Sequence, residues 1–300
     1  MLPVAFDPSY VLALPENHRF PMEKYELLPQ QLLREGSCDP SDFFRPTSAE
    51  WMDVTRTHQE SYVQRLQAGA LERSEIRKIG FPWSAEMVAR EFLIAGGTIE
   101  AVQKAQKYGI AMNVAGGTHH AYPDRGEAFC MLNDQAIAAD WLLVNQQAKQ
   151  ILILDLDVHQ GNGTAVIFQN NPNVFTCSVH GAKNYPFRKE KSDWDIALED
   201  HTPDKEYLKI IDELLPELWQ SVQPDFVFYL SGVDVLASDK LGRLGMSIEG
   251  CKMRDQKVLE FFWRKNIPVT CSMGGGYSPE IKHIVEAHAN TYRIAKNLTE

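Results

Sequence analysis

The sequence lacks the features that mark disulfide-rich, membrane-spanning and secreted proteins. Its five cysteines are scattered and form no CxxC pair, so we expect no disulfide framework and a reducing compartment. No apolar run approaches the ~18 residues that cross a membrane. The chain opens without a basic segment followed by an apolar one, so no secretion signal is evident. We therefore expect a cytoplasmic protein with no membrane span.

Basic residues are also in deficit. Thirty Lys and Arg against 40 Asp and Glu give a net charge of −10. A face that binds nucleic acid needs a surplus of basic residues, so we expect no direct binding of nucleic acid. The negative charge does not exclude a cationic peptide as the substrate. Neither a repeat nor a linker divides the 300 residues, and we expect one domain over residues 1–300.

Regular alternation of strands and helices is predicted from about residue 110 onward. Residues 1–80 are rich in proline and charge and predict mostly irregular structure, with a helix over 25–34; a longer helix is expected over 84–107. Further strands are expected over 110–115, 151–158, 174–179, 226–231 and 267–273. Further helices are expected over 134–147, 164–169, 205–220, 249–265 and 280–296. This pattern predicts a mostly parallel sheet with helices on both faces.

Each of the five expected strands runs into a loop that carries polar, glycine-rich sequence. The loops read GGTHH, HQGNG, HGAKNYPF, GVD and GGGY. The ligand crevice of an open α/β sheet lies outside the carboxyl ends of its strands. We therefore expect these loops to form one site.

The stretch ILILDLDVHQGNGT places Asp155, Asp157 and His159 two residues apart. Alternate residues of a strand share a face, and buried carboxylates need a partner or a metal ion. Asp157 and His159 can converge on one ion if the strand end curls, and Asp234 can supply a third ligand. Two oxygens and one nitrogen suit Zn²⁺ with positions left open, while Fe²⁺ and Mn²⁺ also accept these ligand types.

The remaining loops supply groups for acid–base chemistry. His119 and His120 follow two glycines and can both face a pocket, one as general base and the other as a charged group, with Asp155 orienting one of them. Tyr277 can donate a hydrogen bond to a developing oxyanion. Alternatively, the glycines before it form an anion-binding loop ahead of the helix at residue 280.

Together these motifs resemble the histone deacetylases of the arginase/deacetylase fold. The resemblance covers nearly the whole chain through GGTHHA, GEAFCMLND, DLDVHQGNG, SGVDVLASDKLGRL and GGGYSP, in the family's order. The segments IGFPWS, GGTIEA and LASDKLGRLGMS are most similar to class IV enzymes and their bacterial relatives. The resemblance implies a three-layer sandwich and suggests a bacterial origin.

The resemblance also implies a role for individual residues. It assigns the zinc ligands to Asp157, His159 and Asp234. It assigns catalysis to the pair His119 and His120, with Asp155 orienting His119 and Tyr277 polarising the acyl carbonyl. Substrate-binding positions are Phe129, His180, Leu241, Gly275 and Gly276, with the NYPF segment. A structural K⁺ would be held by Asp155, Asp157, His159 and Ser178.

One position departs from the class I pattern. Asn162 stands where class I enzymes carry an acid behind the second histidine, and Gln160 replaces a common histidine. Asparagine can orient His120 without a negative charge, so it should favour the imidazolium less than aspartate would. Class IV enzymes share this feature. We find no counterpart of the rim acid that class I enzymes use to hold the substrate backbone.

These observations predict a Zn²⁺-dependent amidohydrolase that removes an acetyl or longer fatty acyl group from lysine in a protein or peptide. Acetylpolyamines are an alternative substrate. A binuclear Mn²⁺ ureohydrolase like arginase is a second alternative, although it needs further bridging carboxylates. A non-catalytic module that binds acyl-lysine or metal is a third. The oligomeric state is not predicted.

Overall fold

Eight parallel strands form one sheet at the centre of the computed structural model, which describes residues 1–300. The strands are β1 (Val4–Ala5), β2 (Phe43–Phe44), β3 (Ile110–Asn113), β4 (Ile151–Asp155), β5 (Val174–Gly181), β6 (Trp194–Leu198), β7 (Phe226–Leu230) and β8 (Val269–Ser272). Their order across the sheet is β2-β1-β3-β8-β7-β4-β5-β6, and every pairing is parallel.

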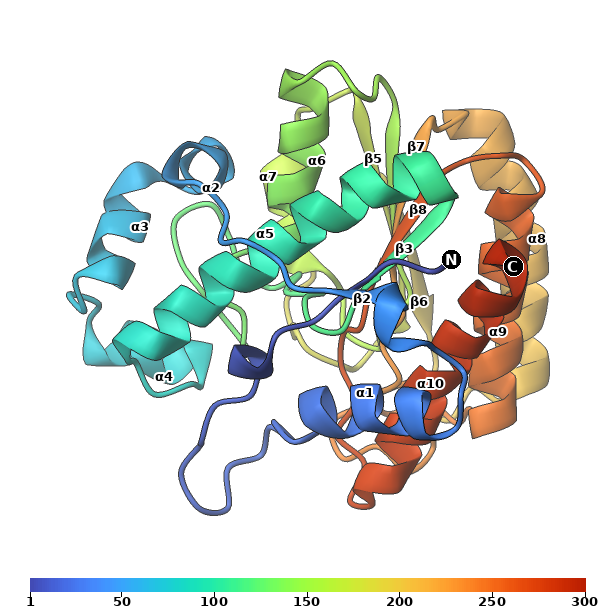
Figure 1. The fold of residues 1–300 in the computed structure, drawn as a ribbon, viewed down its shortest axis with the longest axis horizontal. Coiled ribbons are helices and arrows are strands. Elements are labelled where there is room, and N and C mark those ends of the chain that lie inside the picture. Colours follow the sequence, from blue (N-terminus) through green and yellow to red (C-terminus); the bar gives the residue numbers. More distant parts are fainter.

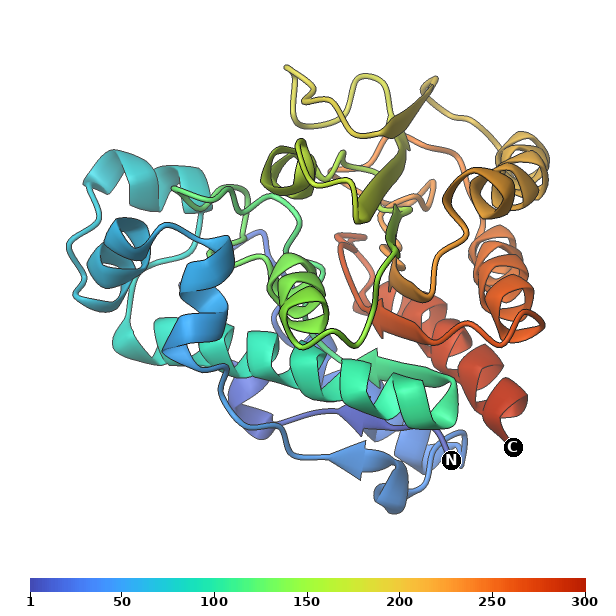
Figure 2. The same cartoon turned by 90° about the horizontal axis from the view of Figure 1, so that it is seen from above.

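Helices cover both faces of this sheet (Figure 1). They are α1 (Lys24–Arg34), α2 (Trp51–Thr57), α3 (Glu60–Gln67), α4 (Arg73–Ile79), α5 (Ala85–Tyr108), α6 (Asp134–Val144), α7 (Asn162–Phe168), α8 (Asp204–Val222), α9 (Ile248–Trp263) and α10 (Ile281–Thr299). Figure 2 shows α8, α9 and α10 on one side of the strands and α5 and α6 on the other. The predicted three-layer α/β fold is confirmed. No helix combines the length and apolar character needed to cross a membrane.

The central elements form where local sequence and burial agree. β4 (ILILD) and β7 (FVFYL) are neighbours and are buried along their whole length, as a strand covered on both faces requires. The long helix α5 begins at Ser84, whose side chain accepts a hydrogen bond from the Met87 amide, and ends at Gly109.

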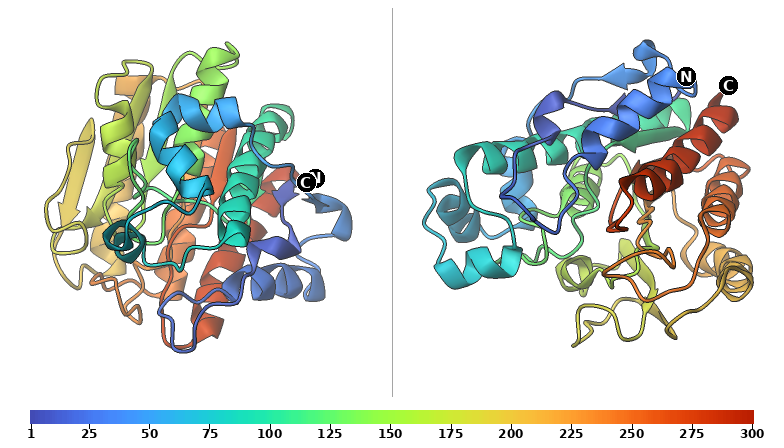
Figure 3. Two further views of the ribbon diagram at one scale, coloured as in Figure 1. Left: turned by 90° about the vertical axis from the view of Figure 1, so that its left-hand side faces the viewer. Right: turned by 90° about the horizontal axis from the view of Figure 1, so that it is seen from below.

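Two parts of the sheet differ from the prediction. Residues 1–80 contain more regular structure than predicted, since α2 to α4 follow the expected helix α1, and β1 and β2 extend the sheet beside β3. β6 is a further edge strand that was not predicted, and its residues alternate between half-buried and exposed, as is typical at the edge of a sheet. Figure 3 shows the two chain ends side by side, where the Met1 amine donates to the Thr299 carbonyl.

The strand order determines where the polar, glycine-rich loops that follow the strands meet. The chain leaves β3 and returns in β4, and the two strands that separate them, β7 and β8, come later in the sequence. Four neighbouring strands, β3, β8, β7 and β4, therefore present their carboxyl ends at one edge. A ligand crevice is expected at such a switch point.

Candidate active site

The three predicted metal ligands meet beyond the ends of β4 and β7. One ligand atom from each of Asp157, His159 and Asp234 lies within 4.8 Å of the other two, and all three residues are buried. Nδ1 of His159 lies 3.1 Å from Oδ1 of Asp157 and 3.1 Å from Oδ2 of Asp234. The structure thus brings one imidazole nitrogen and two carboxylates to a single point.

Hydrogen bonds curl the chain after β4 so that these side chains converge. The carboxylate of Asp155 accepts from the amide of Asp157 (3.1 Å), and that of Asp157 accepts from the amide of His159 (2.9 Å). Asp234 reaches across from the end of β7 and accepts from the Val158 amide (2.9 Å). Such side-chain-to-backbone bonds are typical of tight turns, and they fix the three candidate ligands relative to one another.

The surroundings of this cluster favour a cation. Burial alone would lower the pKa of His159, but its hydrogen bonds to Asp157 and Asp234 outweigh burial and raise the pKa to about 10. The amide of Gly275 donates to Asp157 (2.8 Å), and a Cβ on Gly275 would lie 2.0 Å from Oδ2 of Asp234. The donor set and the close packing around it therefore fit a divalent metal ion of the kind that nitrogen and oxygen ligands bind.

His119 is the member of the histidine pair that lies against carboxylates. Its Nδ1 lies 2.6 Å from Oδ2 of Asp155, and its Nε2 lies 3.9 Å from Asp157. Burial disfavours the charged ring, but the charges of Asp155 and Asp157 outweigh burial and raise the pKa of His119. The predicted contact between Asp155 and His119 is present.

His120 is held as the neutral member. Its ring centroid is 4.1 Å from that of His119, and its Nδ1 lies 2.6 Å from Oδ1 of Asn162. Burial first, and then the charges of His119 and His159, lower its pKa well below the usual value. A neutral ring that donates from Nδ1 to the amide oxygen keeps its Nε2 lone pair free to accept a proton.

A chain of hydrogen bonds continues behind Asn162. Its Nδ2 donates to the Tyr122 hydroxyl (3.0 Å), which donates to Oε1 of Glu190 (3.0 Å). The two-way bond between Gln160 and the backbone of Glu190 holds this acid in place. The Tyr122 hydroxyl donates its only proton to Glu190, so it can only accept a hydrogen bond from Asn162. The side-chain NH₂ of Asn162 therefore points to Tyr122, and its amide oxygen points to His120.

The loop that carries the histidines is anchored by Asp134, a residue that the sequence gave no reason to select. Its Oδ1 accepts from the amides of Gly117 (2.8 Å) and Thr118 (3.0 Å). Gly116 has φ +84, and a Cβ there would lie 2.2 Å from Oδ2 of Asp134. The two glycines thus permit both the turn and the close approach of the carboxylate.

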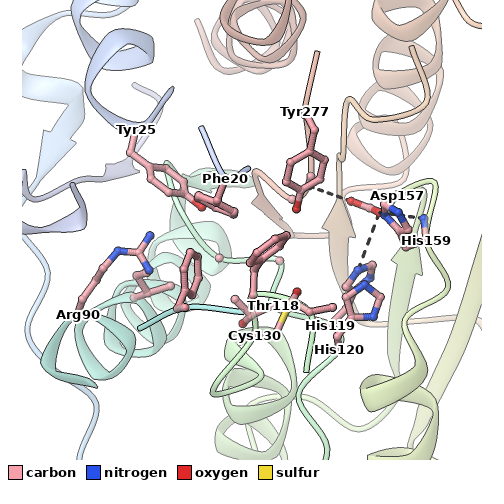
Figure 4. A pocket seen from close by; sticks show the side chains of 18 residues that line it. Phe20, Tyr25, Arg90, Thr118, His119, His120, Cys130, Asp157, His159 and Tyr277 are labelled. Atoms are coloured by element: carbon pink, nitrogen blue, oxygen red, sulfur yellow. Dashed lines mark hydrogen bonds and ion pairs between the residues drawn. The ribbon is translucent and has the colours of Figure 1, made fainter. Parts of the chain in front are cut away.

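Tyr277 stands above the metal-binding cluster, at the opposite side from the histidines (Figure 4). Burial, followed by the charges of Asp234 and Asp157, raises its pKa well above the usual value, so the phenol keeps its proton. Its backbone amide donates to Asp239. Lys24 lies behind the ring with its Nζ 5.6 Å from the ring centre, and donates to the Gly274 carbonyl (3.0 Å).

A buried arginine supports the two ligand-bearing loops from below. Arg254 of α9 is fully buried and pairs with Asp255 (2.8 Å). Its guanidinium donates to the carbonyls of Leu156 (3.1 Å) and Gly232 (2.8 Å), each within two residues of a predicted ligand. The sequence did not single out Arg254, because a lone arginine in a helix predicts an exposed side chain.

The site has a narrow floor and a broad mouth. The floor is a cavity of about 40 Å³ that runs from the histidines and Tyr277 to Tyr25 and Arg90 (Figure 4). The mouth has a volume of about 460 Å³. Phe129 lines both, and Leu241 lines the mouth, as predicted positions of a substrate tunnel should.

Other predicted substrate positions lie differently. Gly275 lines the floor, whereas Gly276 packs behind it against Val233 and Ile284. His180 does not line the tunnel: it is buried within β5, where its Nδ1 lies 2.9 Å from the Ser178 hydroxyl. The opposite wall comes instead from the NYPF segment, through Tyr185, whose ring packs edge-on against His120 at 5.0 Å.

The chain is similar in sequence and in fold to known proteins. Residues 18–292 match the histone deacetylase domain. The chain is 43% identical over 298 residues to an uncharacterised protein of Picosynechococcus sp., covering 99% of each chain. It is 28% identical over 291 residues to histone deacetylase 2 of Arabidopsis thaliana, covering 94% of this chain and 75% of that one. A solved HDAC homologue complexed with SAHA superimposes with a TM-score of 0.86 at 22% identity, over 99% of this chain and 84% of the other.

The α/β fold and the candidate metal cluster beside paired histidines fit a hydrolytic enzyme. With the domain match over most of its length, the chain belongs to the histone deacetylase family, whose members hydrolyse amides. The resemblance inferred from the sequence motifs is thereby confirmed.

Proposed function

We propose that this protein is a zinc-dependent lysine deacylase, close to class IV, that acts on acyl-lysine in proteins or peptides. The observation that carries the proposal is the convergence of Asp157, His159 and Asp234 beside a histidine pair whose two members have different partners, a carboxylate for one and an amide for the other. Zn²⁺ bound there would polarise the acyl carbonyl and lower the pKa of a water molecule.

The side chains can carry out the remaining steps. Tyr277, which keeps its proton, donates a hydrogen bond to the carbonyl oxygen as negative charge develops on it. Neutral His120 accepts the proton of the attacking water at Nε2, while Asp155 holds His119 in its charged form. The histidine pair then protonates the leaving lysine amine.

The floor favours a short acyl group such as acetyl. Its 40 Å³ holds about three water-sized groups, so a fatty acyl chain could enter only if aromatic side chains such as Phe20 and Phe81 moved. At the inner end, Arg90 is buried and its Nη2 has no hydrogen-bond partner. A carboxylate product could accept from it.

The alternatives have less support. The described chain holds only one cluster of three or more metal-binding side chains, so a binuclear Mn²⁺ site like that of arginase lacks its second set of ligands. Complete acid–base groups around the cluster argue against a non-catalytic module. The choice of Zn²⁺ over Fe²⁺ rests on the ligand types alone, which both ions accept.

Two further assignments complete the proposal. A structural K⁺ near β4 and β5 is supported by the direct pairing of Asp155 with Ser178 in the sheet. A reducing cytoplasm is supported by the five cysteines, all of which are free and buried.

The proposal is tested with a fluorogenic peptide series that carries acetyl to myristoyl groups on one lysine. Purified enzyme should hydrolyse the acetyl peptide fastest, lose activity to a chelator, and regain it with one Zn²⁺ per chain. The variant His120→Ala should lose about 10²–10⁴-fold in kcat. Activity that persists in His120→Ala, or two Mn²⁺ per chain by metal analysis, would contradict the proposal.

A further inference from the structure

The mouth of the site has a charge opposite to that of the whole chain. The chain carries a net charge of −10. No aspartate or glutamate lines the mouth, but six cationic side chains do: Arg19, Arg77, Lys78, Lys183, Lys240 and Arg243. The mouth, through which a substrate must pass, is therefore a positively charged region of an acidic chain.

Four of these cations are free to act on a ligand. Lys183 and Arg243 are shared with carboxylates, since both lie within 4.0 Å of Asp200. The other four (Arg19, Arg77, Lys78 and Lys240) are exposed and form no ion pair. An acid does lie near, because Glu23 lines an adjacent cavity that shares Arg19 and Lys240, but it pairs with neither of them.

The four free cations come from three separate parts of the fold that meet around the tunnel. Arg19 precedes α1 and lies with its guanidinium carbon 5.6 Å from the centre of the Phe129 ring, the tunnel wall. Arg77 and Lys78 end α4, and Lys240 precedes the rim residue Leu241. A cleft lined by one sign of charge focuses the field on the ligands that enter it.

We propose that the enzyme selects acyl-lysine in an acidic context, with aspartate or glutamate close to the modified lysine. This inference rests on the proposed deacylase function and specifies its substrate. When an acyl-lysine occupies the tunnel, the residues that flank it in the substrate must lie in the mouth. There the unpaired cations attract a flanking aspartate or glutamate and repel a flanking lysine or arginine. The same field disfavours acetylpolyamines, which are cations at neutral pH, and tails rich in lysine and arginine.

The test uses three peptides of equal length that differ only in the two residues on each side of acetyl-lysine: Glu, Gln or Lys. At low salt we expect kcat/KM about tenfold higher for the Glu peptide than for the Gln peptide, and lower again for the Lys peptide. The difference should shrink in about 1 M salt, where charges are screened beyond about 3 Å. Equal rates at low salt, or a preference for the Lys peptide, would overturn the inference.

Charge-reversal variants assign any preference to the mouth. Arg77→Glu and Lys240→Glu should each reduce the preference for the Glu peptide severalfold, and together reverse it; Arg77→Gln and Lys240→Gln should have intermediate effects. The matched control is Lys149→Glu, an exposed lysine just before β4, at the opposite end of the strand from the site. If Lys149→Glu shifts the preference as much as Lys240→Glu, the mouth does not determine it.

Binding separates this inference from the proposed function. Labelled versions of the three peptides, with an uncleavable ketone in place of the acyl amide, report affinity by fluorescence anisotropy. Preferential binding of the Glu peptide without hydrolysis of any peptide would reject the deacylase function and keep the charge selection. Hydrolysis of all three with equal affinity would keep the function and reject the selection.

Discussion

The floor and the mouth of the site differ in charge, burial and the way they are held. At the floor and directly behind it lie three carboxylates, Asp155, Asp157 and Asp234, which are buried and joined by hydrogen bonds to backbone and imidazole. The cations of the mouth are exposed and have few partners. A buried, hydrogen-bonded floor suits the hydrolysis of one kind of bond, whereas an exposed, charged mouth suits the choice of substrate. Changes to the floor should therefore have large effects on every substrate, and changes to the mouth small effects that depend on the charge of the substrate.

Among changes that leave the catalytic side chains in place, the largest effect is expected at Gly275 in the floor. In Gly275→Ala the new Cβ would lie 2.0 Å from Oδ2 of Asp234 and 2.8 Å from Oδ2 of Asp157, so the ligands must separate. We expect at least a 10–100-fold loss of metal affinity, about that of disturbing residues that hold metal ligands, and a matching loss of activity at limiting Zn²⁺. Metal content after dialysis and kcat measure the two losses.

Gly36→Ala is the control, because that glycine has φ +75 but no atom within 4 Å of an added Cβ. The Gly36→Ala enzyme should have a lower free energy of unfolding but should bind metal as tightly as the unmodified enzyme. A Gly275→Ala enzyme that keeps one tightly bound metal would show that the floor is less rigid than its hydrogen bonds indicate.

The second effect concerns the support of the floor. Arg254→Met leaves Asp255 buried without its cation and frees the carbonyls of Leu156 and Gly232. Removing one partner of a buried pair typically costs about 3–5 kcal/mol in the free energy of unfolding, which urea denaturation measures. The control Arg264→Met removes an exposed partner of Glu260 near the end of the same helix, and should cost less than about 1 kcal/mol. Equal losses in the two variants would contradict a special role for Arg254.

The candidate metal ligands at the floor were predicted from the sequence because their signal is local. Asp155, Asp157 and His159 stand at fixed spacing after an apolar run, and the glycine-rich loops mark the ends of neighbouring strands. The supports were not predicted, since Asp134 and Arg254 act on loops that only the fold brings to them. His180 was assigned to the tunnel by resemblance, although its position within β5 turns it into the protein interior.

The mouth and the first 80 residues lacked such local signals. β1 and β2 are two residues long and form only by pairing with β3 and with each other, so no periodicity can indicate them. Arg19, Arg77 and Lys240 are far apart in the sequence, and each alone predicts an ordinary exposed cation. Their common location follows only from the packing of α4 and the loop after β7 around the tunnel.

The third prediction is a pH effect at the boundary between floor and mouth. His120 must be neutral to accept a proton, and its lowered pKa places the acid limb of kcat below the usual value for histidine, about 6.5. Asn162→Asp places a negatively charged carboxylate beside Nδ1 of His120, which favours the imidazolium and should move the acid limb of the pH profile upward by about 1 pH unit. Activity at pH 6 relative to pH 8 should therefore fall. Asn170→Asp adds the same charge at an exposed position after α7, and should leave the profile unchanged.

A fourth, smaller effect is expected from Tyr122, which connects Asn162 to Glu190 in the loop before β6. Tyr122→Phe removes the acceptor that fixes the Asn162 amide, so the amide can turn and His120 loses its preferred tautomer part of the time. We expect about a tenfold lower kcat, the size of one hydrogen-bond contribution, with KM nearly unchanged. Glu190→Gln leaves an acceptor for the Tyr122 hydroxyl and should have a weaker effect. Tyr108→Phe, at the end of α5, is the control. A Tyr122→Phe enzyme with unaltered kcat would show that the chain of hydrogen bonds behind Asn162 does not orient His120.

The smallest effect is expected in the mouth when the substrate has no charge near the acyl-lysine. Lys240→Gln should change kcat/KM for such a substrate by less than about twofold, because an exposed cation contributes little without an opposite charge. Phe129→Ala should reduce kcat/KM for the same substrate much more, since it removes a wall that the acyl-lysine must contact whatever its flanking residues. If Lys240→Gln weakened turnover of the uncharged substrate as strongly as Phe129→Ala, the mouth would contribute to hydrolysis itself. The division between a floor for chemistry and a mouth for selection would then fail.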